Sequence, residues 1–282
     1  MRPDLIAHHD TVGLARAIAG GRVTAMAVMD HALDAAETQG DGNILSAIRP
    51  DAARAAARAA DSRVGQGGGL PPLLGVPFVV KDNIDCLGWA TACANGALAA
   101  NMPMRTAPVV RRLLDAGAIL LGKANLHELA SGVTGLYPTT PARNIINPLD
   151  PTRMAGGSSA GNAAAIAGGI APFGIGSDTG GSVRIPAACC GVTGFRPSCH
   201  VPTGRVRYNR EGLFPVSPRH DTPGPMARSV RDIIMLDRVL CGHPHGPMPE
   251  PVRPRRIGLP GVFWNCLLYT SDAAADTPCV DL

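Results

Sequence analysis

AGGSSAGNAAAIAGGIAPFGIGSDTGGSVR, residues 155–184, contains the clearest structural signals in this chain. Its pair of serines is typical of a helix start, and we expect that helix to continue to about Ala167. The apolar residues Phe173–Gly176 then predict a short strand, and a glycine turn leads into a second helix over Ser182–Cys190. Helix, strand and helix in this order indicate an α/β architecture.

The same alternation continues on both sides of that stretch. Asp10 and Thr24 are expected to cap two helices, the second over Ala25–Thr38, and the apolar run Val76–Val80 predicts a strand covered on both faces. Residues 197–226 are rich in proline and glycine, and we expect a long surface excursion there. The sequence therefore predicts one central sheet, mixed and mostly parallel, with helices on both faces. The remaining predicted elements are helices over residues 51–62, 106–116 and 229–240 and strands over residues 119–121 and 192–195.

The composition limits the class of protein. Its 282 residues allow one large α/β domain or two small ones, and 45% hydrophobic with 17% charged residues is typical of a globular chain. The net charge of +4 comes from scattered arginines, so we expect an ordinary solvated surface and no nucleic-acid partner. The longest apolar stretch, residues 163–175, is broken by glycine and proline and is too short to span a membrane.

The eight cysteines show no spacing of a disulfide framework or a zinc site, and no C-x-x-C occurs. We therefore expect reduced thiols in a cytoplasmic protein. His243 and His245 flank a proline without a third ligand nearby, so no metal site is expected. The first residues lack the apolar core of a signal peptide.

Lysine is rare in this chain. Only Lys81 and Lys123 occur among its 26 lysine and arginine residues, and Lys81 ends the apolar run that begins at Val76. Arginine stays protonated in a protein, whereas a lysine in apolar surroundings can lose its proton and act as a base. The sequence therefore indicates Lys81 as a candidate base.

A serine follows two glycines in Asp178-Thr-Gly-Gly-Ser182, at the predicted start of a helix. Backbone N–H groups at such a turn point outward with no side chains in the way, which suits an oxyanion hole. On its own, a serine after Gly-Gly is more often a simple helix cap. Its occurrence together with Lys81 and the turn Gly156–Gly161 favours a hydrolase in which a lysine serves a serine nucleophile.

Glycine runs also suggest a phosphate-binding site, which the sequence disfavours. No lysine follows either glycine turn as a P-loop requires, and Gly174–Gly176 lacks the third glycine of a dinucleotide site. The segment Gly157–Gly161 matches the nucleophile elbow G-x-S-x-G, with Ser159 at its centre. Because residues 148–154 upstream are a poor strand, an α/β-hydrolase with a histidine base is the weaker alternative.

A longer pattern joins these pieces. It includes Lys81–Ile84, Gly122–Glu128, Ala155–Gly161, Gly176–Ala187 and Cys190–Pro197. Over about residues 10–260 the chain resembles the amidase signature family, whose members use a serine, a second serine after a cis peptide bond, and a lysine. The resemblance implies a single α/β/α amidase signature domain, which we expect over residues 1–265.

The resemblance implies a role for each matching residue. Ser182 falls on the nucleophile, Ser158 on the bridging serine after a cis bond, and Lys81 on the base. The family implies no metal and no organic cofactor. The oxyanion hole would use the amides of Thr179, Gly180, Gly181 and Ser182, and the supporting positions are Gly157, Ser159, Asp178 and Arg184.

The substrate class follows from the same resemblance. The segment Leu126–Thr134 is more similar to indoleacetamide and mandelamide hydrolases than to the A-type chain of tRNA-dependent amidotransferases. This favours a free-standing hydrolase of aryl or aryl-alkyl amides, with esters, carbamates and urethanes as further small-molecule substrates. An amidotransferase chain that needs partners and an inactive truncated homologue stay open as alternatives. The expected acyl-pocket residues are Leu129, Ala130, Ser131 and Gly132.

The chain stops earlier than the family pattern. Members generally continue well past this length, whereas the pattern here ends near Phe263-Trp264. Cys266–Asp276 resembles a translated sequencing adapter, so we expect a metagenomic gene assembled from short reads, an incomplete domain and a non-native tail over residues 266–282. A genuine but unusual tail is the alternative. Truncation would uncover sheet edges, which favours aggregation or a homodimer.

Overall fold

Three parallel strands form the middle of the sheet, where the sequence predicts buried apolar runs. They are β2 (Pro77–Lys81), β3 (Ile119–Ala124) and β4 (Phe173–Asp178), and β2 pairs with both of the others. Every residue of β2 and β4 is buried, so both faces of these strands are covered. The computed structural model describes residues 9–137, 143–200 and 205–243.

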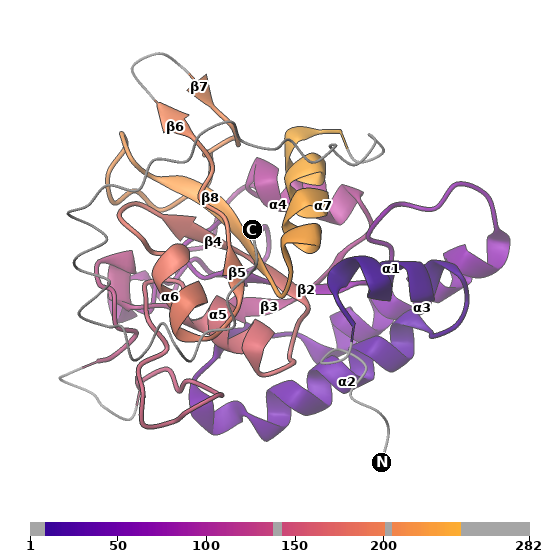
Figure 1. Ribbon diagram of the computed structural model, residues 1–282, viewed down its shortest axis with the longest axis horizontal. Coiled ribbons are helices and arrows are strands. Elements are labelled where there is room, and N and C mark those ends of the chain that lie inside the picture. The colour runs from indigo at the N-terminus through magenta and orange to yellow at the C-terminus, as the bar shows by residue number, and fades with distance from the viewer. Residues whose placement is uncertain (1–8, 138–142, 201–204, 244–282) are drawn as a thin grey trace, which may run out of the picture. The chain divides into compact units, whose positions relative to one another are not determined.

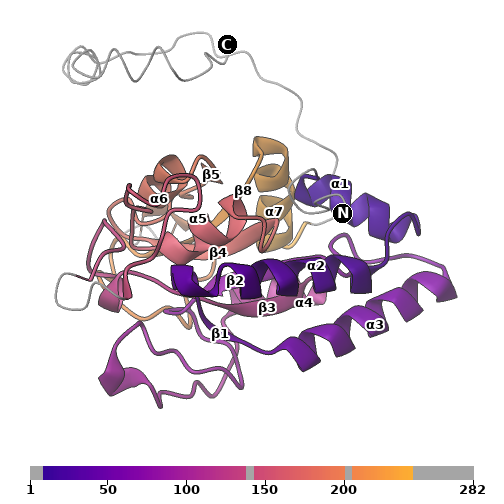
Figure 2. The same ribbon diagram turned by 90° about the horizontal axis from the view of Figure 1, so that it is seen from below.

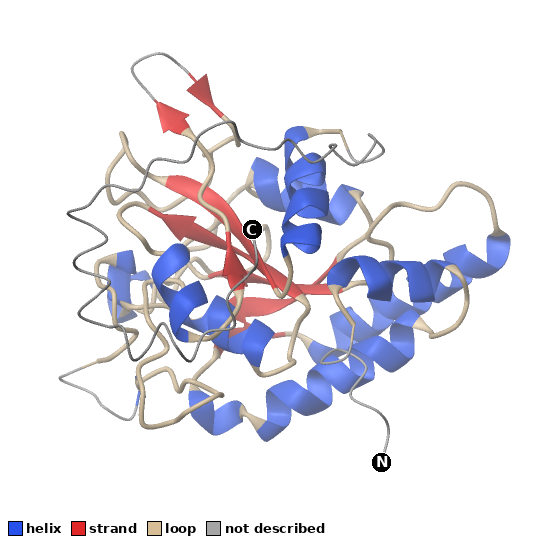
Figure 3. Cartoon of the chain, in the orientation of Figure 1, coloured by secondary structure: helices blue, strands red, loops and turns tan. Residues whose placement is uncertain are grey.

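Antiparallel strands extend the sheet on both sides (Figure 3). The order is β1-β3-β2-β4-β8-β5, in which β1 (Leu45–Ile48) pairs with β3 and β8 (Thr222–Ala227) lies between β4 and β5 (Thr193–Gly194). Strands β2, β3, β4 and β5 run in one direction and β1 and β8 in the other, so the sheet is mixed, as predicted, with parallel pairing in its middle and antiparallel pairing toward its edges. A separate ribbon pairs β6 (Cys199–His200) with β7 (Arg205–Val206).

Helices pack around the sheet (Figure 1). Helix α5 contacts β2, β3, β4 and β8, whereas α2 and α3 lie side by side (Figure 2). The predicted caps Asp10 and Thr24 each accept a backbone N–H of the following turn, and Ser229 does the same at the start of the last helix. None of the helices in the described ranges is long and apolar enough to cross a membrane. The α-helices are α1 (Thr11–Ala19), α2 (Ala25–Thr38), α3 (Pro50–Gln66), α4 (Pro108–Asp115), α5 (Ala160–Ala167), α6 (Arg184–Cys189) and α7 (Val230–Cys241), and the short 3-10 helices are η1 (Gly40–Gly42), η2 (Gly96–Leu98) and η3 (Glu128–Ala130).

Strand β8 shows that one sequence prediction is wrong. The expected surface excursion over residues 197–226 ends in a buried strand inside the sheet. This strand could not be recognised in the sequence because it contains Pro223 and Pro225, and proline is normally excluded from central strands. The Pro225 carbonyl accepts the N–H of Phe195, which is the residue after the end of β5. Pro223 and Pro225 therefore lack their N–H groups on the side of β8 where the pairing with β5 has already ended. The side that faces β4 keeps its full register.

The predicted domain boundary does not fall within these ranges. The expected end of the domain at residue 265 and the expected tail over residues 266–282 both lie outside the described residues. The described part belongs to one unit, which positions the carboxyl ends of β2 and β4 next to the start of α5. The two ends carry Lys81, the predicted base, and Asp178, a predicted supporting residue.

Candidate active site

Lys81 is the last residue of β2, and its side chain is fully buried. Its Nζ lies 2.7 Å from the Oγ of Ser158, 2.9 Å from the Oγ of Ser177 and 3.2 Å from the Ser177 carbonyl oxygen. Burial lowers the pKa of Lys81 to about 7, although nearby acidic groups, Asp178 first among them, act in the opposite direction. Near neutral pH a large share of this lysine is therefore an uncharged amine that can accept a proton.

Ser158 stands in a tight turn before α5. The Gly157–Ser158 peptide bond is cis, as the family resemblance implies. A Cβ on Gly157 would lie only 3.0–3.1 Å from backbone atoms of residues 132–135, so the turn has no space for a larger residue. The Ser158 carbonyl accepts the N–H of His127 at 3.1 Å. This packing buries Ser158 fully, with its Oγ against Lys81.

Ser182 lies in the turn between β4 and α6. Its carbonyl oxygen accepts the N–H of Ser159 at 3.0 Å, which joins this turn to the one that holds Ser158. Gly181 has a φ of 132°, a backbone conformation that residues with a side chain rarely adopt. Gly180 is exposed, and a Cβ at this position would meet no other atom. Ser182 itself is 7% exposed. The structure thus brings Lys81, Ser158 and the turn that carries Ser182 into one region.

Asp178 holds that turn in place. Its two carboxylate oxygens accept the N–H groups of Gly181 at 2.8 Å and Val183 at 3.1 Å, and Arg184 donates to both oxygens at 3.1 Å. Burial by itself would raise the pKa of Asp178, but these donors keep it below its ordinary value. Among the amides expected in the oxyanion hole, that of Gly181 is therefore already engaged by Asp178.

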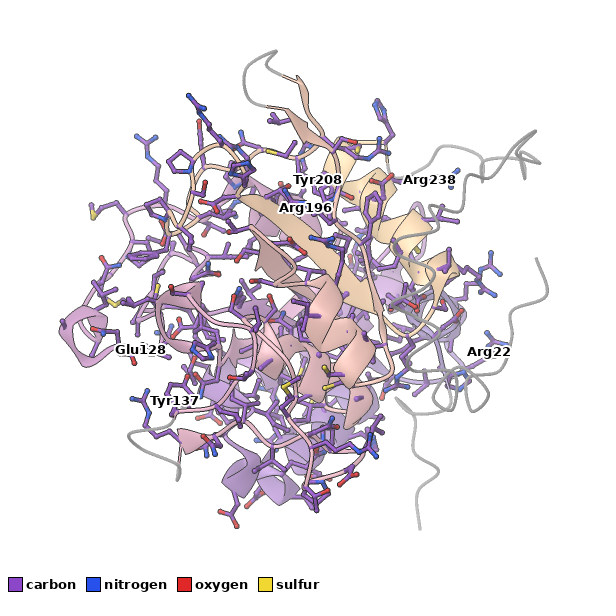
Figure 4. The ribbon with its side chains drawn as sticks, turned by 60° about the vertical axis from the view of Figure 1, so that its left-hand side comes forward. Arg22, Glu128, Tyr137, Arg196, Tyr208 and Arg238 are labelled. Carbon is purple, nitrogen blue, oxygen red and sulfur yellow. The ribbon has the colours of Figure 1, made fainter. Side chains whose placement is uncertain are left out.

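Three further residues complete the cluster, and sequence reasoning did not single them out. Ser177 accepts hydrogen bonds from both Lys81 and Asn83 at 2.9 Å. Arg196 donates to the Asp178 carboxylate at 2.9 Å and to its carbonyl oxygen (Figure 4). Ser177 precedes Asp178 and Asn83 follows Lys81 by two, so both stand inside the recognised pattern. The signal was present, but the pattern alone does not say which members touch.

The expected acyl-pocket residues lie in η3 and the loop after it. Leu129 and Ala130 have φ angles of 54° and 56°, and the Leu129 N–H donates to the carbonyl of Cys93, whose φ is 51°. Non-glycine residues adopt this conformation only where the surrounding structure enforces it, and they cluster at functional sites. The loop continues to Gly132, whose carbonyl oxygen would be 3.0 Å from a Cβ on Gly157.

His127 lies under this loop. A Cβ on Gly132 would stand 2.1 Å from the His127 ring, so the ring and the glycine are in close contact. Burial lowers the pKa of His127, although Glu128 opposes the shift. The ring also stacks on Tyr137, and Figure 4 shows Glu128 and Tyr137 on the same side of the molecule. His127 therefore connects the expected pocket to the Ser158 turn through its own N–H.

Other candidate sites in the described ranges lack a comparable group of reactive side chains. A surface groove of about 460 Å³ runs between the end of α2, β1 and the start of α3, and it contains none of the residues above. No group of three histidine, cysteine, aspartate or glutamate residues within the described part is arranged to hold a metal ion. The buried cluster around Lys81 is therefore the candidate active site.

Known proteins resemble this chain over most of its length. The profile of the amidase family matches residues 27–256. The A-type chain of the glutamyl-tRNA(Gln) amidotransferase of Deinococcus deserti is 42% identical over 82% of this chain, and indoleacetamide hydrolase of Rhizobium radiobacter is 40% identical over 79%. The structure of native peptide amidase from Stenotrophomonas maltophilia is 30% identical over 89% of this chain, with a TM-score of 0.76.

The match covers only part of each relative. This chain spans 45% of the length of the amidotransferase chain, 45% of the indoleacetamide hydrolase and 52% of the peptide amidase chain. The sequence suggested two kinds of relative, amidotransferase chains and indoleacetamide hydrolases. Both occur, at 42% and 40% sequence identity to this chain.

Proposed function

Because this chain belongs to the amidase family, we propose that it is a serine hydrolase that cleaves carboxamide C–N bonds through an acyl-enzyme on Ser182. The observation that carries the proposal is the fully buried Lys81 amine 2.7 Å from Ser158 Oγ. A lysine whose pKa is lowered to about 7 can remove a proton from a serine at neutral pH. No metal or organic cofactor is required for this chemistry.

Acylation forms one bond, between Ser182 Oγ and the carbonyl carbon, and breaks one, the C–N bond. Lys81 accepts the hydroxyl proton of Ser158 as Ser158 takes the hydroxyl proton of Ser182. Ser182 Oγ attacks the amide carbonyl. The backbone N–H groups of the turn Thr179–Ser182 other than that of Gly181, which Asp178 holds, stabilise the oxyanion, with one such donor worth about 3 kcal/mol. The C–N bond then breaks, and the amine leaves with the proton returned through Ser158. Water cleaves the ester by the same relay.

The neighbouring side chains support this relay. Ser177, held by Asn83, offers the Lys81 amine a second hydroxyl and thereby orients it toward Ser158. Asp178 and Arg184 keep the nucleophile turn in the conformation that faces the substrate. Ser159 donates its hydroxyl to the Ser177 carbonyl at 3.2 Å, which fixes the turn that carries Ser158 to strand β4.

We further propose aryl or aryl-alkyl amides as the substrate class. The relative indoleacetamide hydrolase supports this choice, and the short side chains of Ala130, Ser131 and Gly132 leave space for a bulky acyl group. Esters, carbamates and urethanes fit the same acyl-enzyme chemistry, since their carbonyl carbons accept the same nucleophile. A small-molecule substrate is thus proposed, without a nucleic-acid or membrane partner.

A second candidate function is that of the A-type chain of a tRNA-dependent amidotransferase. The Deinococcus relative of that name, at 42% identity, favours it. We expect the purified chain alone to hydrolyse an aryl-alkyl p-nitroanilide, measured by p-nitroaniline release, because the proposed relay needs no second protein. Activity that appears only after partner proteins and tRNA are added would instead support the amidotransferase.

The proposed base makes turnover depend on pH in a defined direction. The uncharged form of Lys81 is the reactive one, and its pKa is lowered to about 7 by burial. We expect kcat/KM to fall about tenfold per pH unit below pH 7 and to level off above it. A series of initial rates from pH 5 to pH 9 measures this. A flat profile across that range would contradict the assignment of Lys81 as the base.

A further inference from the structure

Lys123 is the second of the two lysines, and it is as fully buried as Lys81. In the parallel pairing of β2 with β3, Lys123 lies opposite Val80. Successive side chains of a strand point to opposite faces, so Lys123 is on the face away from Lys81, together with Asp82. The Lys123 Nζ lies 3.1 Å from Asp82 Oδ1, in agreement with this placement.

The Lys123 ammonium has three oxygen neighbours, all from the segment that directly follows Lys81. It donates to the carbonyls of Ile84 at 2.8 Å and Ala90 at 3.2 Å, and it forms the ion pair with Asp82. The two carbonyls accept two of its N–H groups and the Asp82 carboxylate faces its charge, so the compact ammonium of a lysine suits this closed space, whereas the wide planar guanidinium of an arginine does not. Lys123 therefore fastens residues 82–90 to β3.

The fastened segment carries the groups that orient the reactive amine. The Ile84 N–H donates to the Lys81 carbonyl at 3.0 Å and closes a turn, and the carbonyl of the same Ile84 is the one that Lys123 binds. Within that turn, Lys81 and Asn83 both reach the Oγ of Ser177 at 2.9 Å. A shift of this turn would move both side chains away from Ser177.

The same segment is also connected to the expected acyl pocket. The Asp82 carbonyl accepts the N–H of Cys93 at 3.1 Å, and the Cys93 carbonyl accepts the N–H of Leu129 at 2.9 Å. Contacts thus run from Lys123 through Asp82 to the amine on one side and to the pocket loop on the other.

We propose that Lys123 is a positioning residue, whose ammonium holds residues 82–90 in the conformation that presents the Lys81 amine to Ser158 and Asn83 to Ser177. The inference deepens the proposed function and rests on it for its kinetic test. Lys123 touches neither the substrate nor the reacting atoms, because it lies on the other face of the sheet. Its effect is geometric, since it acts through the backbone that follows Lys81.

The kinetic test compares Lys123→Met with the double variant Asp82→Asn/Lys123→Met. The single variant leaves a buried carboxylate without its partner, which lowers both stability and activity. The double variant no longer has that unpaired carboxylate charge, but it still lacks the ammonium. We expect its thermal midpoint to return toward that of the wild type while kcat stays about 100-fold low, with KM changed by no more than about threefold.

A matched control separates this effect from general loss of stability. Asp232 is also fully buried, and it accepts the Val12 N–H at 3.0 Å between α1 and α7, away from the cluster. Asp232→Ala removes this acceptor and is expected to lower the thermal midpoint without lowering kcat at a temperature where the variant is folded. Wild-type kcat in folded Lys123→Met, or recovery of kcat in the double variant, would overturn the positioning role.

A second readout does not depend on turnover. Because the chain has only two lysines, labelling lysine Cε with carbon-13 gives two NMR signals, and Lys123→Met leaves the one from Lys81. We expect that signal to move and broaden in Lys123→Met and in the double variant, and to keep its position in Asp232→Ala. An unchanged Lys81 signal would refute the inference. Failure of the proposed function is distinct, because it appears as wild-type protein without turnover.

Discussion

Ser182→Ala is expected to abolish amide hydrolysis, with a fall in kcat of about 10⁵- to 10⁶-fold, because the hydroxyl that forms the acyl-enzyme is removed. Reaction of the wild type with a fluorophosphonate should add one phosphonyl group to Ser182, and the variant should stay unlabelled. Intact-mass measurement followed by peptide mapping identifies the modified residue.

Ser159→Ala is the matched comparison for this experiment. Ser159 stands at the centre of the G-x-S-x-G sequence, so an α/β-hydrolase mechanism would place the label there. The proposed mechanism instead predicts that Ser159→Ala is still labelled on Ser182, because the Ser159 hydroxyl takes no part in the proton transfers. Labelling should be slower, because the hydrogen bond from this hydroxyl to the Ser177 carbonyl is lost. A label found on Ser159 in the wild type would reject Ser182 as the nucleophile.

Lys81→Met is expected to lower kcat by about 10³- to 10⁴-fold, because the proposed relay loses its base. Methionine fills a similar volume in the fully buried site but cannot accept a proton. The rise of kcat/KM with pH near neutrality should disappear with the amine. Steady-state rates from pH 5 to pH 9, on protein with a cooperative thermal transition, measure both effects.

Lys81→Arg tests whether basicity or charge matters at this position. Arginine stays protonated, so it supplies a positive charge near Ser158 but no base. The proposed role of Lys81 therefore predicts that Lys81→Arg is as inactive as Lys81→Met. Substantial turnover by the arginine variant would mean that the lysine acts through its charge, and the proton relay would have to be abandoned.

Local sequence patterns predicted most of the helices and the central strands. Helix α2 has the predicted bounds Ala25–Thr38, since its cap Thr24 and its apolar spacing are both local signals. Strand β8 was missed because two prolines in six residues argue against a strand, and their tolerance depends on where the short β5 ends. Strand β1 was not predicted either, since its four residues are only partly buried or exposed.

The candidate site shows the same division between local and distant information. Lys81, Ser158 and Ser182 stand out in the sequence because a rare lysine and two glycine-rich serine turns occur together. Ser177, Asn83 and Arg196 did not stand out, because their importance comes from contacts that no local pattern records. The variants above test the proposed roles of Lys81 and Ser182 directly.

The amino-acid sequence alone shows which reactive groups the chain possesses, which glycine-rich turns carry serines, and to which family the chain belongs. Which of these groups meet depends on the tertiary structure. Lys81 and Ser158 are 77 residues apart, and the order and register of β2, β3 and β4 bring one lysine to Ser158 and turn the other toward Asp82. Strand order and register depend on packing between distant segments, and short-range periodicity carries no information about them.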